Sequence, residues 1–181
     1  MAFLTHRSTN KPQDMNKIII TASLVLASTL SFAQSKDVVD IAIGSKDHTT
    51  LVTAVKAADL VTTLKGKGPF TLFAPTNAAF DKLPDGTLDG LLKPDSKAAL
   101  SGILTYHVVA GNMDAAAVTA AIKAGNGKAV LTTVNGAKLT ASFKDGRVML
   151  TDSKGGTAMV TTTDLKATNG VVHVIDTVLM P

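Results

Sequence analysis

The stretch that decides the fold is Phe70-Thr71-Leu72-Phe73-Ala74-Pro75-Thr76-Asn77-Ala78-Ala79-Phe80. Its apolar first half predicts a strand, and the strand has to end at Pro75 because proline has no backbone N–H to donate to a sheet. Thr76 or Asn77 can then accept a hydrogen bond from the free amides at the start of a helix. Phe80 follows one helical turn later and is expected to point into the core. The stretch therefore predicts a strand that passes directly into a capped helix.

A second stretch, about 100 residues further along, joins a tight turn to an apolar strand: Thr168-Asn169-Gly170-Val171-Val172-His173-Val174-Ile175-Asp176-Thr177-Val178-Leu179. Gly170 permits the backbone angles that a tight turn needs. The residues that follow are apolar on both faces, which is typical of a strand inside a sheet. We therefore predict a turn at Asn169-Gly170 and a buried final strand over residues 171–180.

The rest of the chain changes its hydrophobic period from helical to alternating. Residues 50–64, 96–107 and 114–124 carry apolar side chains at helical spacing. Residues 138–144 alternate strictly and are followed by Asp145-Gly146, a pair that favours a β-hairpin turn. A further strand is expected over residues 157–163, and a polar loop over residues 164–169. Helices first and a mostly antiparallel run of strands afterwards predict an α+β domain with segregated layers.

Together the two stretches resemble the two signature boxes of the fasciclin domain, and they occur in the same order. Tyr106-His107, at the predicted end of a helix, is similar to the Tyr-His pair of that family. Residues 37–42 (Asp-Val-Val-Asp-Ile-Ala) are similar to its opening helix. The resemblance covers Asp37 to Pro181. It implies a fasciclin-like α+β fold, a twisted antiparallel β-wedge packed with several α-helices.

The resemblance also implies a function: a non-enzymatic adhesion or partner-binding module of cell surfaces or extracellular matrix, without a cofactor. Its partner would be a protein or a polysaccharide. Asp164-Leu165 is similar to the Asp-Ile segment proposed for receptor binding in animal members, with Leu165 in place of Ile. The candidate binding surface is therefore Tyr106, His107, Asp164 and Leu165. The residues expected to maintain the fold are those of the two boxes: Pro75, Thr76, Asn77, Phe80, Asn169, Gly170, His173 and Asp176.

The N-terminal residues have the pattern of a secretory signal peptide. Lys17 precedes an uncharged run over residues 18–30, and Ser31-Phe32-Ala33 places small residues at both recognition positions of a cleavage site. The run is shorter than the ~20 apolar residues that a membrane-spanning helix needs. Met15 is an alternative start. We therefore predict cleavage near Ala33, a single domain over residues 34–181, and a periplasmic or extracellular location.

The composition argues against several chemistries. The chain has no Cys and no Glu, which removes disulfides, thiolate chemistry and Glu-based acid–base catalysis. Cleavage after Ala33 would remove three cations and one Asp, so the net charge would fall from +4 to +2. Scattered charges, a single Tyr and no Trp argue against nucleic acid as a partner. His107 and His173 lie on predicted apolar faces, which favours core histidines over metal ligands.

Two alternatives stay open on these residues. A periplasmic small-ligand-binding or hydrolytic protein would need at least two of six side chains to meet in one pocket: Asp47, His48, His107, Asp164, His173 and Asp176. Four cations are expected on the solvent side of one hairpin: Lys138, Lys144, Arg147 and Lys154. An ordinary solvated face is the default interpretation of these charges, and a surface for anionic polysaccharide or lipid headgroups is the alternative.

Overall fold

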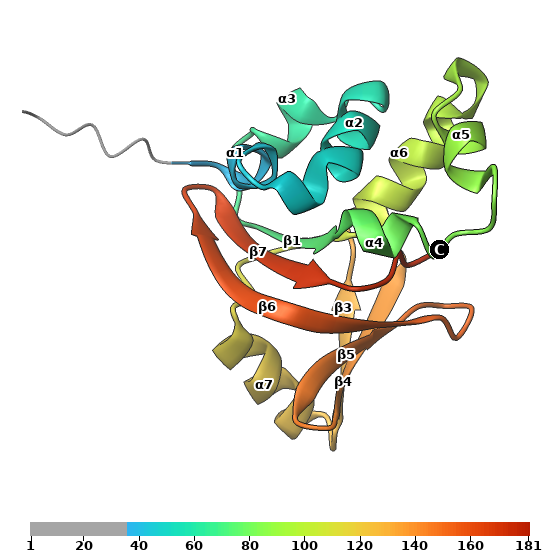
Figure 1. The fold of residues 1–181 in the computed structure, drawn as a ribbon. Coiled ribbons are helices and arrows are strands. Elements are labelled where there is room, and N and C mark those ends of the chain that lie inside the picture. Colours follow the sequence, from blue (N-terminus) through green and yellow to red (C-terminus); the bar gives the residue numbers. More distant parts are fainter. Residues whose placement is uncertain (1–35) are drawn as a thin grey trace, which may run out of the picture. The chain divides into compact units, whose positions relative to one another are not determined.

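The computed structural model describes residues 36–181, so the expected signal peptide at residues 1–33 lies outside the described residues. The described chain begins with short helices and ends in strands (Figure 1). The α-helices are α1 (Val38–Ile43), α2 (Thr49–Ala57), α3 (Val61–Leu64), α4 (Asn77–Phe80), α5 (Thr87–Leu91), α6 (Lys97–Tyr106) and α7 (Ala115–Ala124). The strands are β1 (Phe70–Pro75), β2 (Val108–Ala110), β3 (Lys128–Thr132), β4 (Lys138–Lys144), β5 (Arg147–Thr151), β6 (Thr157–Ala167) and β7 (Gly170–Ile175). Short 3-10 helices η1 (Lys46–His48) and η2 (Pro94–Ser96) precede α2 and α6.

The strands form one sheet of seven in the order β2-β1-β7-β6-β5-β4-β3. β1 and β7 are parallel neighbours, in register from Phe70 opposite Gly170 to Pro75 opposite Ile175. The two stretches that decide the fold therefore lie side by side in the sheet, and the chain between them supplies the long crossover that a parallel pair requires. The other pairings are antiparallel. The expected α+β wedge is confirmed, with this one parallel pair as a departure from antiparallel pairing.

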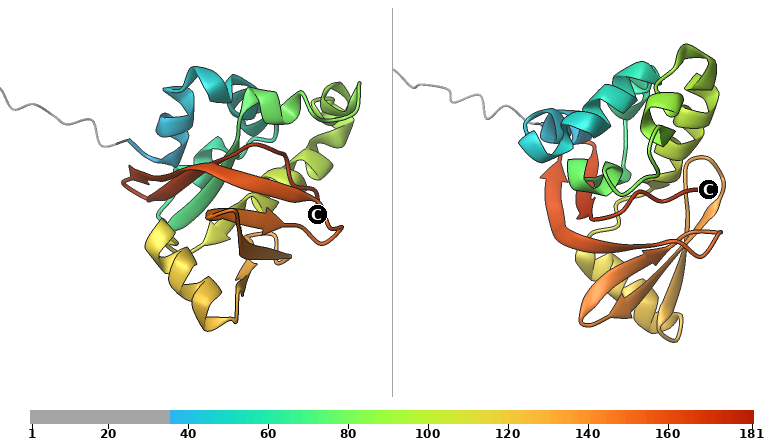
Figure 2. Two further views of the ribbon diagram at one scale, coloured as in Figure 1. Left: turned by 60° about the horizontal axis from the view of Figure 1, so that its bottom comes forward. Right: turned by 45° about the vertical axis from the view of Figure 1, so that its right-hand side comes forward.

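The sheet curls until its two end strands approach each other. Val109 of β2 forms a bridge with Thr133, just beyond β3, and the Val134 amide donates to the Val108 carbonyl at 2.7 Å. The long strand β6 pairs with β5 at one end and with β7 at the other, with register shifts between Val160 and Leu165. Figure 2 shows β6 crossing between the two halves of the sheet. Irregularities of this kind bend a strand and increase its twist, which accounts for the wedge.

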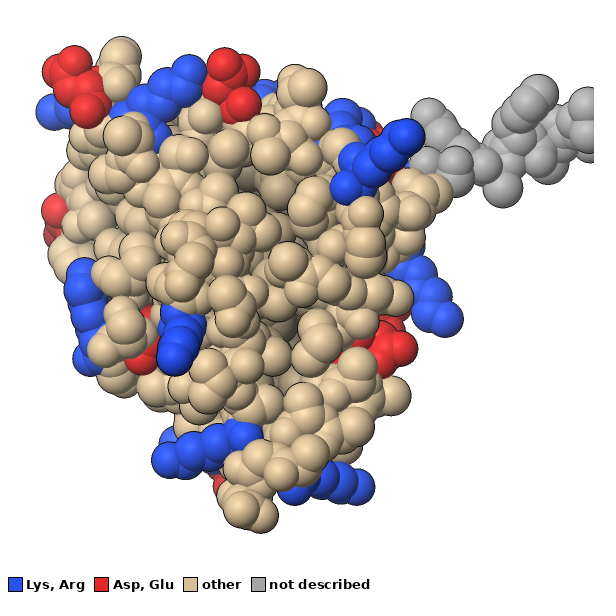
Figure 3. All heavy atoms as spheres, turned by 180° about the vertical axis from the view of Figure 1, so that it is seen from behind, with Lys and Arg blue, Asp and Glu red and all other residues tan. Residues whose placement is uncertain are grey.

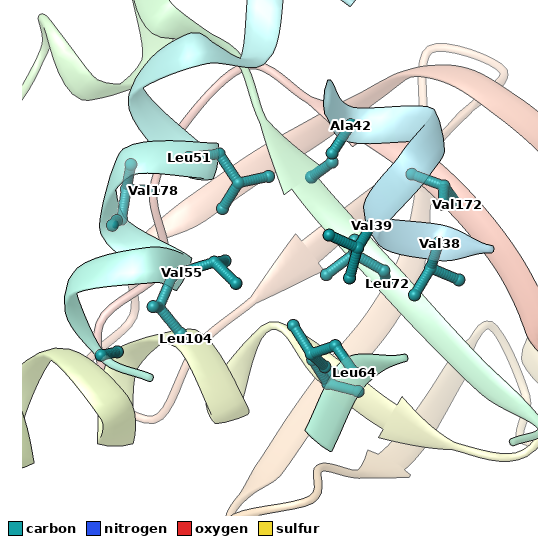
Figure 4. Close-up of a cluster of buried hydrophobic side chains, with 14 of the residues drawn as sticks. Val38, Val39, Ala42, Leu51, Val55, Leu64, Leu72, Leu104, Val172 and Val178 are labelled. Carbon is teal, nitrogen blue, oxygen red and sulfur yellow. The ribbon is translucent and has the colours of Figure 1, made fainter. Parts of the chain in front are cut away.

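Two hydrophobic clusters lie on opposite faces of β1 and β7. Leu72 and Val172 point into the first cluster, and Phe73 and Ile175 point into the second, as the alternation of side chains along a strand requires. The first cluster lies between the sheet and the N-terminal helices, and Figure 4 shows its side chains gathered around Leu72. The second fills the inside of the wedge, where α7 packs against β3 and β4.

Several elements appear where the sequence predicts them. The helical patterns over residues 96–107 and 114–124 correspond to α6 and α7. The alternating pattern forms the β4–β5 hairpin, with Asp145 and Gly146 both at positive φ in the turn, 50° and 75°. β1 ends at Pro75 and α4 begins two residues later. In each case the sequence signal is local, and the packing of the rest of the chain agrees with it.

Three boundaries differ from the expectation. The helix expected over residues 50–64 is divided into α2 and α3, because Asp59 has a φ of 59°, a left-handed conformation that a helix does not continue through. The polar loop expected over residues 164–169 is mostly strand, since β6 continues to Ala167. The last strand ends at Ile175 and not at Met180. Beyond it, Asp176 turns back to accept a hydrogen bond from the Met159 amide at 2.8 Å.

Candidate functional site

Tyr106 and His107 connect the end of α6 to the interior of the wedge. Tyr106 is 0% exposed and His107 is 1% exposed. The Tyr106 hydroxyl donates to the Lys138 carbonyl at 3.0 Å, and burial raises the pKa of Tyr106. The His107 carbonyl accepts from the Phe73 amide at 2.8 Å. The sequence places this pair at a candidate binding surface, but burial puts both side chains inside, where they link α6 to β1 and β4.

The hydrogen bonds of His107 define a neutral ring. Nδ1 lies 2.8 Å from the carbonyl oxygen of Ile103, which can only accept, so Nδ1 donates. Nε2 lies 3.1 Å from the amide of Leu179, which can only donate, so Nε2 accepts. Burial lowers the pKa of His107 to about 4, against smaller opposite effects of the Ile103 carbonyl and of Asp152. Both nitrogens are therefore engaged by the backbone.

His173 plays a comparable part in β7. Its ring stacks on Phe73 of the neighbouring strand, with the ring centroids 5.6 Å apart. Nε2 donates to the Met113 carbonyl at 2.7 Å, and Nδ1 accepts from the Asp164 amide at 3.3 Å. His173 thus ties β7 to the irregular part of β6 and to the segment that leads into α7.

Asp164 occupies the β-bulge of β6. Its φ of 61° is a conformation that Asp adopts more readily than most residues. Its Oδ1 accepts from the Ala115 amide at 2.8 Å, and Asp114 accepts from the Ala117 amide at 2.8 Å, so two carboxylates cap the start of α7. Asp164 is also exposed. It is held in place and open to solvent, as binding residues on a rigid scaffold usually are.

The residues after Asp164 alternate between the core and solvent. Leu165 pairs with Val172 and packs, half-buried, against the first hydrophobic cluster. Lys166 is exposed. The exposed side chains of residues 164–166 are therefore Asp164 and Lys166, whereas Leu165 anchors the strand.

An open hollow of about 580 Å³ lies at the tip of the β6–β7 hairpin. It is lined by residues 65–69, by Asn112 and by residues 167–170. A second hollow of about 210 Å³ shares Asn112, Ala167 and Gly170 with the first and also includes Lys166. The sequence gives no signal for this hollow, because Asn112 is brought to the hairpin only by the fold and has no local motif around it.

Asn169 secures the segments around the hollow. Its Oδ1 accepts from the Val38 amide at 3.0 Å, and its Nδ2 donates to the carbonyls of Leu64 at 2.8 Å and Gly66 at 3.1 Å. Gly170 lies so close to β1 that a Cβ there would collide with the Phe70 carbonyl oxygen. Besides forming a turn, the Asn-Gly pair therefore connects α1 and the end of α3 to the sheet.

Thr76 and Asn77 serve two different helices. The Thr76 hydroxyl accepts from the Ala79 amide at 3.3 Å and caps α4. Asn77 Oδ1 accepts from the Thr50 amide at 3.0 Å at the start of α2, and its Nδ2 donates to the Lys46 carbonyl at 3.0 Å. The first box therefore caps its own helix and also holds a helix that precedes it by 27 residues.

In residues 36–181 no carboxylate of the hydrolytic alternative is hydrogen-bonded to one of its histidine rings. Asp164 meets His173 through its backbone amide, not its carboxylate. His48 is buried and bonded to the Ser45 hydroxyl at 2.8 Å, and burial lowers its pKa. Among residues 36–181 no three His or Asp side chains are placed to hold a metal ion together.

Over the same residues, every helix is too short or too polar to cross a bilayer. Figure 3, the view from behind, shows charged side chains dispersed along the edges of that face.

Comparison with known sequences gives a consistent match. A family model for the fasciclin domain matches residues 46–181. Protein sll1483 of Synechocystis sp. is 42% identical over 167 residues, which is 92% of this chain and 86% of that protein. The cell surface glycolipoprotein MPB83 of Mycobacterium bovis is 42% identical over 123 residues, which is 68% of this chain and 48% of that protein.

A solved structure shares the fold. The FAS1 domain pair from the insect cell adhesion molecule Fasciclin I aligns with a TM-score of 0.57 at 22% sequence identity, covering 72% of this chain and 45% of that chain. At this level of identity the likeness concerns the fold alone, and it agrees with the curled sheet and its helical layer.

Proposed function

Because this chain belongs to the fasciclin domain family, we propose that it is a secreted, non-enzymatic adhesion or partner-binding module acting at the cell surface, in the envelope or in the extracellular matrix. The observation that carries the proposal is the exposed, rigidly held bulge of β6 beside the hollow at the β6–β7 hairpin. A relative named as a cell surface glycolipoprotein supports the location.

The bulge surface, made of Asp164, Lys166 and Asn112 together with the two hollows, offers complementary polar groups. Asp164, Lys166 and Asn112 expose a carboxylate, an ammonium group and an amide, and the last two residues line the second hollow together. Such a surface fits a polar protein segment or a polysaccharide better than an apolar ligand. The ring nitrogens of His107 and His173 are bonded to backbone, which favours binding over acid–base chemistry.

The test uses charge-removing substitutions that keep the fold. Asp164→Asn retains the oxygen that accepts from Ala115 and tolerates the positive φ, and Lys166→Gln removes the neighbouring charge. The double variant is expected to retain less of whatever wild-type protein captures from its own envelope and matrix fractions. Asp145→Asn is the matched control, because Asp145 is exposed at a φ of 50° in a different turn.

Circular dichroism and the melting curve should be nearly the same for all of these proteins. Equal capture by the double variant and by the wild type would contradict the assignment to the bulge surface. Saturable hydrolysis of an ester, a glycan or a phosphate by the purified protein would favour the hydrolytic alternative instead.

A further inference from the structure

The outer face of β3, β4 and β5 is a sheet surface whose charged residues are all positive. Ala129, Leu131 and Leu139 are buried inside the wedge, so the residues that alternate with them point outward. The outward charged residues are Lys128, Lys138, Lys144 and Arg147, and all four are exposed. No Asp occurs in any of these three strands. We call this surface the basic sheet face.

The cations of the basic sheet face have no ionic partner among the described residues. The ion pairs in residues 36–181 involve other cations, namely Lys65, Lys82 and Lys97. Asp145 stands in the turn beyond Lys144 and Arg147. Asp152, in the next turn, is engaged by three backbone amides, those of Lys154, Gly156 and Met180. The positive charge of the face is therefore available to an external anion.

The spacing of the cations favours a chain of negative charges over a single small anion. Lys144 lies directly opposite Arg147, whereas Lys128 is opposite Ser142 and Lys138 is opposite Thr132. Lys138 and Lys144 stand six residues apart at the two ends of β4. At ~3.4 Å per residue this separation is about 20 Å. A small anion could contact one end of the face, but only an extended polyanion can contact both.

The middle of the face carries hydroxyl groups and no aromatic ring. Val130, Thr140 and Thr151 form one row across the three strands, and Val130 is 61% exposed. Threonine hydroxyls both donate and accept hydrogen bonds, as the hydroxyls of a sugar do. Phe143 is 42% exposed but belongs to the inward set of β4. The face therefore lacks the stacking platform on which single-stranded nucleic acids rely.

We propose that the basic sheet face binds a linear acidic polysaccharide. Its anionic groups contact the cations at the two ends of β4, and its sugar rings lie across the row of Val130, Thr140 and Thr151. The inference goes beyond the bulge surface, with which it shares no residue, and it names the class of ligand. It holds whether or not the bulge surface captures a partner.

The test measures binding of the full chain to alginate, a linear polyuronate, with neutral dextran as the uncharged reference. The wild type is expected to bind alginate and not dextran, with an affinity that falls as salt is added. The triple variant Lys138→Gln, Lys144→Gln, Arg147→Gln is expected to bind alginate at least tenfold more weakly. A matched triple variant loses the same charge elsewhere, at Lys46, Lys56 and Lys93, all exposed and outside the face. It is expected to change the affinity less than twofold.

Several results would overturn the proposal. Equal weakening by both triple variants would show that net charge alone attracts the polysaccharide. If single-stranded DNA or anionic phosphatidylglycerol vesicles bind as tightly as alginate, with the same sensitivity to the first triple variant, the face belongs to that other ligand. Asp164→Asn should leave alginate binding unchanged, so failure at the bulge surface and failure at this face are distinguishable.

Discussion

Between pH 7.5 and 4.5 the domain is expected to lose stability through His107. Its ring is buried, donates to the Ile103 carbonyl and accepts from the Leu179 amide. Protonation of Nε2 would therefore place a second N–H group opposite the N–H group of Leu179. Burial lowers the pKa of His107 to about 4 in the folded protein. An unfolded chain gives histidine a pKa of ~6.5. Between these values the unfolded chain binds a proton that the folded chain does not, so the free energy of unfolding falls as the pH falls.

The magnitude follows from the difference between the two pKa values. At ~1.4 kcal/mol per unit, a difference of roughly 2.5 units amounts to about 3 kcal/mol, of which about 2.5 kcal/mol is lost by pH 4.5. That is a large share of the ~5–15 kcal/mol that stabilises a typical domain. Asp176 does not interfere: partial burial opposes its ionisation, but the Met159 amide and the Thr177 hydroxyl hold its pKa below the usual value. Its contribution is therefore lost only below about pH 4.

Urea unfolding followed by circular dichroism at pH 7.5 and 4.5 measures the effect. His107→Gln offers the Leu179 amide an acceptor but cannot titrate. It is expected to start ~1–3 kcal/mol less stable than the wild type and to lose about 2.5 kcal/mol less on acidification. His48, whose pKa burial also lowers, is present in both proteins and cancels. The reasoning fails if the two proteins lose stability in parallel, or if nuclear magnetic resonance finds the His107 ring titrating near its ordinary value.

Three further predictions concern the fold and export. Thr76→Ala removes the acceptor for the Ala79 amide and should lower the free energy of urea unfolding by ~1 kcal/mol; an unchanged midpoint would contradict the capping role. Asn169→Ala leaves the Val38 amide and two carbonyls without their partner, and a loss of roughly 2–4 kcal/mol in the free energy of unfolding is expected in the same assay. A loss below ~0.5 kcal/mol would show that Asn169 does not connect these segments in the way described. The intact mass of exported protein should correspond to a chain beginning at Gln34, and a membrane-bound product that keeps the apolar run would overturn cleavage.

The predictable parts of the fold are those whose cause lies within a few residues. Pro75 ends β1 and Thr76 caps α4 because each acts on its own neighbours. The Asp145-Gly146 turn likewise fixes the register of the β4–β5 hairpin, in agreement with the alternation before it. Burial of His107 and His173 also follows from local pattern, since each interrupts an apolar face without ending it.

The parts that sequence reasoning missed depend on residues distant in the chain. Asn77 accepts a hydrogen bond from the Thr50 amide at the start of α2, and no local pattern around Thr50 predicts this contact. Asp164 lies in a bulge because β6 bends between β5 and β7, so a polar segment that favours a loop forms part of a strand. The sequence shows the cations of the basic sheet face but not their arrangement, because the arrangement depends on the register of β3, β4 and β5.

These contacts separate the residues that identify the family from those that can select a partner. Asn77, His107, Asn169 and His173 are each bonded to the main chain of another segment, and Thr76 caps its own helix. A domain that exchanged one binding partner for another would still need all of these residues. They therefore identify a scaffold and carry no information about what it binds. Exposed side chains outside such contacts can change at a cost of a few tenths of a kcal/mol. Lys166 of the bulge surface and the cations of the basic sheet face are side chains of that kind, whereas Asp164 also accepts from the Ala115 amide. We therefore expect partner choice to be determined on those two surfaces, with Asp164 the least free to change.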